Sequence, residues 1–296
     1  MKAVVITRLM GGLGNQMFQY AAGRAIALRQ GSPLLLDLGF FAKKDGIHTQ
    51  RPFELDIFPI QAEKAAARDL RPFLCFERSG IGATLERELR RVQGHGYHTD
   101  RVQGYQPSTA DARGRVLLNG YWQSEKYFLP AAETIRREFA FKQPLTSLDH
   151  DLAMRMGTAN SISLHIRRGD YVSDPNASAF YANCGLEYYA AGISHIRGRK
   201  PEPELFIFSD DPEWVRRNMR FDHPTTFITH NTGDRSYMDM RLMSYCRHHI
   251  IANSSFSWWG AWLNADPQKI VVAPKQWFRD PRVSSKDLIP ADWVQL

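Results

Sequence analysis

The chain has 296 residues, of which 43% are hydrophobic and 23% are charged. This is the composition of a globular protein, and it excludes a disordered, collagen-like or disulfide-scaffold protein. Cys75, Cys184 and Cys246 form no Cys-x-x-Cys pair, so we expect neither a disulfide framework nor a thiolate zinc site. No apolar run approaches the roughly 20 residues that span a bilayer, and the start of the chain has no signal-peptide pattern. We therefore expect a cytoplasmic protein.

Basic residues outnumber acidic ones, 38 against 31, which gives a formal net charge of +7. This charge favours anionic partners, and nucleotides, nucleic acid and an acidic membrane surface all fit it. The basic residues are dispersed and accompany no nucleic-acid reader motif. Nucleic acid is therefore the partner that we expect least.

The amino-terminal half begins with a strand, a glycine-containing loop, a helix and a second strand. Residues 3–7 are apolar and β-branched and predict the first strand. A helical pattern follows, with Asn15 as a candidate cap at its start and Gly31 at its end. Residues 34–36 predict a second strand, which runs into Asp37. Such a unit builds a parallel sheet with its loops at one edge.

The loop before the first helix imitates a dinucleotide-binding fingerprint, with Gly12 and Gly14 after a strand and Asp37 at the end of the next. Met17 occupies the third glycine position, where a side chain hinders the close packing that the fingerprint requires, so we do not expect NAD. The two glycines still let the backbone approach a ligand, and Asn15 offers an amide beside them.

The carboxyl-terminal half alternates strands and helices at the spacing of a doubly wound α/β domain. The expected strands are residues 161–166, 205–208, 226–228, 249–252 and 270–272, and the expected helices are residues 186–196, 212–219, 236–246 and 257–263. Another helix is expected to begin around residues 121–128, and segment 142–151 is the best candidate boundary. We predict one domain over residues 1–150 and a second over residues 151–296.

Polar side chains directly follow three of these strands, where ligands of such sheets bind. In the first segment, His165 and Arg167 share one face of the extended chain and Arg168 lies on the other. A guanidinium has a fork of donors that matches a phosphate. The alternative is that the arginines form surface ion pairs, with Asp170 as partner.

The second segment holds two adjacent carboxylates, Asp210 and Asp211, before Pro212. Ser209 or Asp210 is a candidate cap for the helix that follows. A cap uses one acidic residue, and the other can accept hydrogen bonds from guanine. Capping and guanine recognition both remain open.

The third segment is a small polar turn, Asn253, Ser254 and Ser255, that leads through Phe256 into a tryptophan-rich helix. Free amides and serine hydroxyls at a helix start form an anion site. The tryptophans are expected to pack in the core.

We expect no metal site. His248 and His249 are adjacent in a strand, so their rings point to opposite faces and cannot bind one ion. No Asp-x-Asp element stands out, and phosphate charge is expected to be neutralised by arginine and by helix-end amides.

Five segments, in order along the chain, resemble the bacterial α-1,2-fucosyltransferases of glycosyltransferase family 11. They are residues 11–20 (GGLGNQMFQY), 120–128 (GYWQSEKYF), 165–170 (HIRRGD), 208–211 (FSDD) and 253–260 (NSSFSWWG). The resemblance implies a GT-B fold, in which two Rossmann-like, doubly wound domains face each other across a cleft. It also implies a carboxyl-terminal domain that binds GDP-fucose, an amino-terminal domain on the acceptor side, and no need for a metal or other cofactor.

The resemblance further implies roles for single residues. Arg167 contacts the β-phosphate, His165 faces the nucleoside, and Arg168 and Asp170 support the loop. Asp210 or Asp211 reads guanine. The diphosphate is held by Ser254, Ser255 and the helix start that follows, and Asn253 and Phe256 are also expected to bind the donor. The fucose is faced by Asn15 with Gly12 and Gly14.

The implied function is transfer of L-fucose, with inversion, from GDP-fucose to O2 of a terminal β-galactoside in a glycan. A transferase for another GDP-sugar and a non-catalytic nucleotide- or glycan-binding protein remain as alternatives. Asp174, Asp37 and Glu54 are the candidates for a general base, and none of them stands out. The positive charge also leaves open a peripheral position at the inner membrane, through a lipid-linked acceptor.

Overall fold

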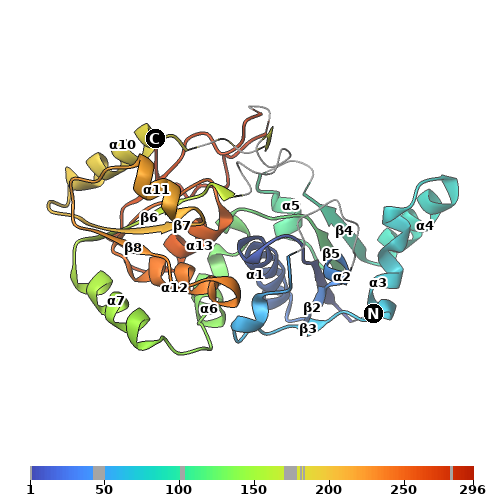
Figure 1. The fold of residues 1–296 in the computed structure, drawn as a ribbon. Helices are drawn as coiled ribbons and strands as arrows, with labels where there is room; N and C mark the ends of the chain where they lie inside the picture. The colour runs from blue at the N-terminus through green and yellow to red at the C-terminus, as the bar shows by residue number, and fades with distance from the viewer. Residues whose placement is uncertain are drawn as a thin grey trace. The chain divides into compact units, whose positions relative to one another are not determined.

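The computed structural model describes residues 2–42, 51–100, 104–169, 179–180, 182, 184–280 and 283–296. The chain forms two compact units, Met1–Lys142 with Lys286–Leu288 and Gln143–Ser285 with Ile289–Leu296 (Figure 1). Each unit is built on a parallel sheet with helices packed against it, as in a Rossmann-like domain. This confirms the expected class, and the roles predicted for the two domains stay predictions.

The sheet of the first unit has the strand order β3-β2-β1-β5-β4. Its strands are β1 (Val4–Arg8), β2 (Leu34–Asp37), β3 (Glu63–Lys64), β4 (His95–Thr99) and β5 (Arg115–Asn119). Its helices are α1 (Leu13–Gln30), α2 (Gly39–Ala42), α3 (Ala67–Leu70), α4 (Ile81–Val92), α5 (Pro107–Ala110) and α6 (Ala132–Glu138), with 3-10 turns η1 (Leu55–Ile57), η2 (Arg71–Glu77), η3 (Glu125–Tyr127) and η4 (Leu129–Ala131). The predicted strand-loop-helix-strand unit is confirmed as β1, α1 and β2.

Helix α1 begins earlier than predicted. Gly12 is its N-cap residue and Asn15 lies within its first turn, so Asn15 does not cap it. The sequence pattern missed this start because the cap is made by backbone alone, without a side-chain hydrogen bond. Gly31 closes the helix in the left-handed conformation, as expected. Further along, Gly23 lies so close to β1 that an added Cβ would be 2.0 Å from the hydroxyl of Thr7.

The helix predicted around residues 121–128 does not begin there. Trp122 has a φ of 55°, which a helix does not allow, and the chain continues through η3 and η4 before α6 begins at Ala132. Strands β4 and β5 are additions to the predicted elements. In the sheet, β5 lies between β1 and β4, with Leu117 opposite Ile6 and Tyr97.

The sheet of the second unit has the order β11-β10-β9-β6-β7-β8. Its strands are β6 (Ser161–Ile166), β7 (Glu204–Ser209), β8 (Thr225–Ile228), β9 (His248–Ile250), β10 (Val271–Ala273) and β11 (Val294–Gln295). Its helices are α7 (Ser147–Thr158), α10 (Leu186–Arg197), α11 (Pro212–Asn218), α12 (Tyr237–Tyr245) and α13 (Ser255–Leu263), with the 3-10 turn η5 (Gly233–Arg235). The expected strands and helices of this half are confirmed to within a few residues. The additions are α7 and β11.

Apolar side chains of the second sheet point alternately to its two faces. Ile162 and Leu164 of β6 join the cluster that includes α10 and α11. Phe206 and Phe208 of β7 join another cluster, with α7 and α12. Because both faces are covered, ligands reach this sheet at the ends of its strands. Within the described residues, no helix has the length and apolar character needed to cross a membrane.

Candidate functional site

Arg167 and Asp210 meet at the carboxyl edge of the second sheet. They directly follow Ile166 and Ser209, which are paired in register between β6 and β7. Nη1 of Arg167 lies 2.9 Å from Oδ2 of Asp210, and each side chain is 24% exposed. Oδ1 of Asp210 accepts a 2.8 Å hydrogen bond from the backbone amide of Arg168. Asp210 therefore fixes the start of the loop after β6 and holds the guanidinium of Arg167 at a partly exposed position.

Arg168 is bound on the other side of this loop. Its guanidinium carbon lies 3.5 Å from the centre of the Trp214 ring, and its Nε donates to Oδ2 of Asp211 at 3.4 Å. Gly169 follows, and an added Cβ there would lie 2.5 Å from Oδ2 of Asp210. The described start of this loop, residues 167–169, therefore packs tightly on the residues that follow β7.

The cap of α11 differs from the prediction, which named Ser209 or Asp210. The N-cap residue is Asp211, whose Oδ1 accepts a 3.2 Å hydrogen bond from the amide of Trp214. The reason is Pro212, whose fixed φ makes it the first helical residue. Ser209 instead donates its hydroxyl to the Ile166 carbonyl and accepts from the Asp211 amide.

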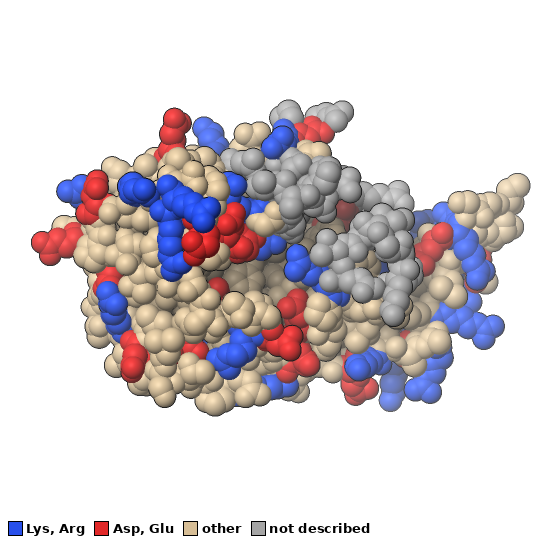
Figure 2. Space-filling model, in the orientation of Figure 1, with Lys and Arg blue, Asp and Glu red and all other residues tan. Residues whose placement is uncertain are grey.

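Charges of both signs surround α11. On the described part of the face in Figure 2, basic and acidic side chains lie side by side near this helix. Arg216 and Glu213 form one such pair, at 2.7 Å. The visible face therefore has interspersed charges rather than one basic stripe.

His165 is a neutral, buried histidine. Burial, with the charge of Arg167 as a second cause, lowers its pKa to about 3. Its ring centre lies 5.9 Å from that of Phe256, and its carbonyl accepts from the hydroxyl of Tyr189 at 3.1 Å. Among the described residues, Nδ1 of His165 has no hydrogen-bond partner although it is buried. The side chain is therefore held between β6 and α13 with one polar atom unused.

The start of α13 reaches the same sheet edge, because β9 is the other neighbour of β6. Ser254 is the N-cap residue and accepts from the amide of Phe256 at 3.3 Å. Asn253 is buried, and its Nδ2 donates to the carbonyls of Ala182 and Trp277. Asn253 therefore anchors neighbouring loops, whereas Ser254, Ser255 and Phe256 are partly exposed. Trp258, Trp259 and Trp262 are buried, as expected.

A polar cluster that the sequence analysis missed lies beyond β8, next to β7 in the sheet. Asp239, in the first turn of α12, accepts from Nδ2 of Asn231 at 3.0 Å. Asp149 accepts from Nε2 of His230 at 2.8 Å and from Arg235 at 3.2 Å. Burial raises the pKa of Asp239 to about 7. For Asp149, burial acts in the same direction, but its hydrogen bonds outweigh it and lower the pKa.

One sequence signal pointed to this cluster. Asp239 stands in the first turn of a predicted helix that follows a predicted strand and the polar loop from His230 to Arg235. Its connection to Asp149 joins residues about ninety positions apart, which no local pattern shows.

In the first unit, two predicted residues lie around the start of α1. Oδ1 of Asn15 accepts from Nε2 of Gln123 at 2.8 Å, which brings segment 120–128 beside the glycine loop. Gly12 is partly exposed, whereas Gly14 is buried inside α1. Gln16 is also buried and donates to the carbonyls of Gly11 and Pro52. Gln16 therefore ties two loops together, and Asn15 and Gly12 stay accessible.

The candidate bases differ in their surroundings. Asp37 is buried at the end of β2, where it accepts from Nε of Arg8 and the amide of Gly39. Glu54 lies near the start of α1 and accepts from the backbone of Leu13, and burial raises its pKa. Asp174 and Asp170 lie outside the described residues.

Metal-ligand geometry is absent from the part of the chain that the structure describes, where no three His, Cys, Asp or Glu side chains converge. His249 is bound to Ser163 and Asn264, and Nδ1 of His248 accepts from the amide of Ile270.

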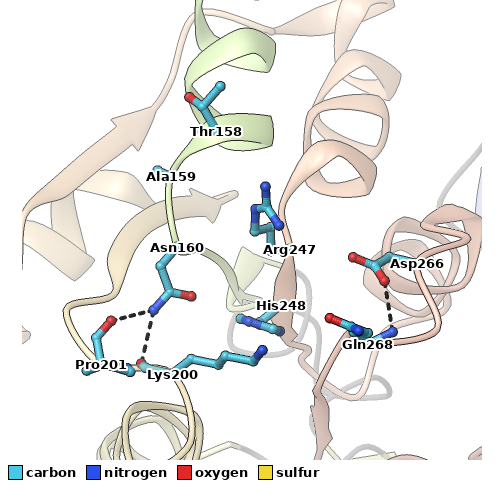
Figure 3. A pocket seen from close by; sticks show the side chains of 9 residues that line it. All are labelled: Thr158, Ala159, Asn160, Lys200, Pro201, Arg247, His248, Asp266 and Gln268. Atoms are coloured by element: carbon cyan, nitrogen blue, oxygen red, sulfur yellow. Dashed lines mark hydrogen bonds between the residues drawn. The ribbon is translucent and has the colours of Figure 1, made fainter.

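A cavity of about 320 Å³ lies at the opposite, amino edge of the second sheet (Figure 3). It is lined by Thr158, Ala159, Asn160, Lys200, Pro201, Arg247, His248, Asp266 and Gln268. Carbonyl ends of helices converge at this edge, and Arg247 donates to the carbonyl of Gly157 near the end of α7 at 2.9 Å. Basic side chains there offset the negative ends of helix dipoles. The cavity is therefore not the site that the polar segments predict.

Comparison with known proteins identifies the family. The family model for glycosyl transferase family 11 matches residues 91–296, more than half of the chain. The chain belongs to glycosyl transferase family 11. An alpha-1,2-colitosyltransferase from Escherichia coli is 36% identical over 99% of each chain. The O-antigen biosynthesis glycosyltransferase WbnK from Escherichia coli is 33% identical over 97% of this chain and 99% of its own. The galactoside alpha-(1,2)-fucosyltransferase 1 of Pan troglodytes is more distant, at 25% identity over 86% of this chain and 63% of its own.

Solved structures show the fold of this family 11 glycosyltransferase. Fucosyltransferase NodZ from Bradyrhizobium matches with a TM-score of 0.51 and 14% identity, over 88% of this chain and 92% of its own. NodZ alpha-1,6-fucosyltransferase co-crystallized with GDP matches with a TM-score of 0.52 and 16% identity over the same shares, 88% and 92%. These matches confirm the expected GT-B type of fold.

Proposed function

We propose that this glycosyltransferase moves L-fucose, with inversion, from GDP-fucose to O2 of a terminal β-galactoside. The observation that carries the proposal is the Arg167–Asp210 pair at the carboxyl edge of the second sheet, 2.9 Å apart and partly exposed. A guanidinium held at this edge suits the diphosphate of a nucleotide sugar. The α-1,2 linkage is supported by the names of relatives at 36% and 25% identity.

In this proposal the second unit holds the donor. The β-phosphate lies against Arg167 and the start of α13, where amides and the hydroxyls of Ser254 and Ser255 face an anion. Arg168, bound to Trp214 and Asp211, keeps the loop in place. Nδ1 of His165, buried behind this edge and without a hydrogen-bond partner among the described residues, is available to a group of the donor.

The geometry shifts the proposed guanine contact. Asp210 already binds Arg167 and the Arg168 amide, and Asp211 already caps α11. Asp239 is a third carboxylate at the same sheet edge, with Asn231 as its hydrogen-bond donor. A carboxylate accepts well from the N1 and N2 donors of guanine. We therefore assign guanine to Asp239 in preference to Asp210 or Asp211.

The reaction breaks the bond between the anomeric carbon and the β-phosphate oxygen, and forms a bond from that carbon to O2 of the acceptor. The acceptor attacks opposite the diphosphate, which inverts the configuration. Negative charge grows on the departing β-phosphate, and donors fixed before the reaction stabilise it best. Arg167 supplies this stabilisation, and a metal is not needed for it.

The acceptor hydroxyl loses its proton in this reaction. Of the described candidates, Glu54 fits a general base better than Asp37. A base works best with a pKa close to the working pH, and burial raises that of Glu54. Asp37 is instead bound to Arg8 in a partly buried ion pair. Asp174 stays a candidate from sequence.

A second donor, GDP-colitose, is favoured by the relative named alpha-1,2-colitosyltransferase. A panel of GDP-fucose, GDP-colitose and GDP-mannose, tested with several β-galactosides in the presence of EDTA, separates the two. We expect transfer from GDP-fucose, undiminished by the chelator, and an α-1,2 linkage in the product by NMR. Transfer from GDP-colitose alone would mean that colitose, and not fucose, is the sugar transferred. GDP binding without any transfer would contradict the proposal.

A further inference from the structure

Helix α4 turns its apolar side chains away from the protein. Ile81, Leu85, Leu89 and Val92 are 84%, 69%, 55% and 86% exposed. Spacings of four, four and three residues place them on one side of the helix, as a stripe about 16 Å long. We call these four residues the α4 stripe. Figure 1 shows α4 standing out from the rest of the first unit.

The inward side of α4 is polar. Arg87 donates to the carbonyls of Arg78 and Ala83, and Arg90 contacts Glu86. Arg87, Arg90 and Glu86 are only partly exposed, and the helix rests on η2 and β4. A surface helix normally buries its apolar face and exposes its charges. In α4 this arrangement is reversed, so folding of the chain alone does not explain the stripe.

The charge around the stripe is positive. Between residues 78 and 92 there are four arginines, at 78, 87, 90 and 91, and two glutamates, at 86 and 88, a net charge of +2. Both glutamates are paired, Glu86 with Arg90 and Glu88 with Arg91. Arg87 and Arg90 lie on the inward side, so the arginines on the exposed side next to the stripe are Arg78 and Arg91, the latter beside Glu88.

We propose that α4 docks on the surface of a membrane that contains anionic phospholipid. The α4 stripe enters the boundary between headgroups and acyl chains, and the exposed Arg78 and Arg91 stay among the anionic headgroups. The positive charge complements such a surface. A second copy of the chain is a poorer fit, because four side chains fall short of the roughly 800 Å² per partner of a stable interface. This inference rests on the geometry of α4 and not on the proposed sugar transfer.

Vesicle flotation tests this inference directly. The full chain is mixed with phosphatidylcholine vesicles, with or without about one third phosphatidylglycerol, and the bound fraction is measured at low and high salt. We expect binding to the anionic vesicles at low salt, at least tenfold weaker for the double variant Leu85→Ser, Leu89→Ser. High salt should weaken binding of the wild type, because headgroup attraction is screened.

Leu129→Ser, Leu148→Ser is the matched control, since these leucines are 52% and 53% exposed and lie outside α4. This control should bind vesicles like the wild type. GDP binding and the melting temperature should be unchanged in both double variants, which shows that each folds. The inference is overturned if the wild type does not float, if the α4 variant floats equally well, or if sedimentation shows a dimer that the α4 variant abolishes.

Discussion

Arg167 and Asp210, 43 residues apart in sequence, form a 2.9 Å ion pair across the ends of two neighbouring strands. The same carboxylate binds the backbone amide of Arg168, so it fixes both the start of the loop and the guanidinium. An arginine fixed in this way loses little freedom when a phosphate arrives, and preorganised charge is what stabilises a departing diphosphate.

Arg167→Ala should lower turnover by at least ~100-fold, as removal of one preorganised donor typically does. Arg167→Lys should also be poor, because a point charge cannot reproduce the two-pronged guanidinium contact. Steady-state kinetics of transfer measure both. Arg216→Ala is the control, since Arg216 pairs with Glu213 on the surface of α11. Full turnover in Arg167→Ala would refute the role of this residue.

Binding of GDP should depend on pH through Asp239, whose pKa is about 7 in the unliganded chain. The N–H donors of guanine bind the ionised carboxylate. Below this pKa, Asp239 must therefore lose its proton before GDP can bind. Affinity should fall about tenfold from pH 8 to pH 6, measured by calorimetry. Asp239→Asn should remove this part of the pH dependence and reduce the preference for GDP over IDP, which lacks the 2-amino group. An unchanged slope and preference in Asp239→Asn would exclude the guanine assignment.

Ionisation of Asp239 should favour GDP binding but destabilise the folded chain. Its pKa is raised above the ~3.9 of an unfolded aspartate, so the folded state binds the proton more tightly. The contribution of Asp239 to stability is therefore present below about pH 4 and is lost as pH rises towards 7. The melting temperature of Asp239→Asn should not show this decrease between pH 4 and pH 7. The same dependence of melting temperature on pH in the variant and the wild type would contradict the raised pKa.

Gly12→Ala should reduce activity without affecting the stability of the fold. Gly12 has a φ of −79°, and no atom lies within 4 Å of an added Cβ, so the melting temperature should not change. Activity should nevertheless fall by at least ~10-fold, because a methyl group there obstructs close approach of the sugar. Gly23→Ala is the contrasting variant, since its Cβ would overlap Thr7 and destabilise the fold by about 1–3 kcal/mol. Full activity in Gly12→Ala would remove Gly12 from the site.

Glu138 is expected to be a main anchor of the first unit. It accepts from Arg24 through both oxygens and from the buried hydroxyl of Tyr20. Glu138→Ala should cost roughly 3–5 kcal/mol, because a largely buried guanidinium loses its partner. Chemical denaturation measures this loss. Arg29→Ala, which breaks the surface pair with Asp111, should stay within about 0.5 kcal/mol. Equal effects of the two substitutions would contradict the anchoring role.

The second sheet was the more predictable of the two. Its central strands are buried on both faces, so they appear in the sequence as short apolar runs, such as residues 205–208, bounded by polar residues. The polar segments that follow these strands were predictable for the same reason, because parallel strands end at one edge. In contrast, β4 contains His95 and His98 and lacks an apolar pattern. Its ring contacts come from a separate segment, since Phe73 and Phe76 of η2 pack on His95 and Tyr97.

Local sequence patterns could not predict which side chains of the site bind each other. The described contacts join Arg167 to Asp210 through the register of β6 and β7, which no residue spacing shows. The pairing with Asp170 stays a prediction, because Asp170 lies outside the described residues. The cluster of Asp149 and Asp239 likewise depends on α7 packing against α12. Such contacts are set by the order of strands and helices in space, which residue spacing does not determine.

A crystal structure of the chain with GDP bound would show whether Arg167 and the start of α13 hold the diphosphate. We expect the diphosphate at the carboxyl edge of the second sheet, with the β-phosphate on the Arg167 guanidinium and the start of α13. A nucleotide bound at another place, or an Arg167 side chain that keeps Asp210 as its partner and leaves the phosphates untouched, would contradict this expectation.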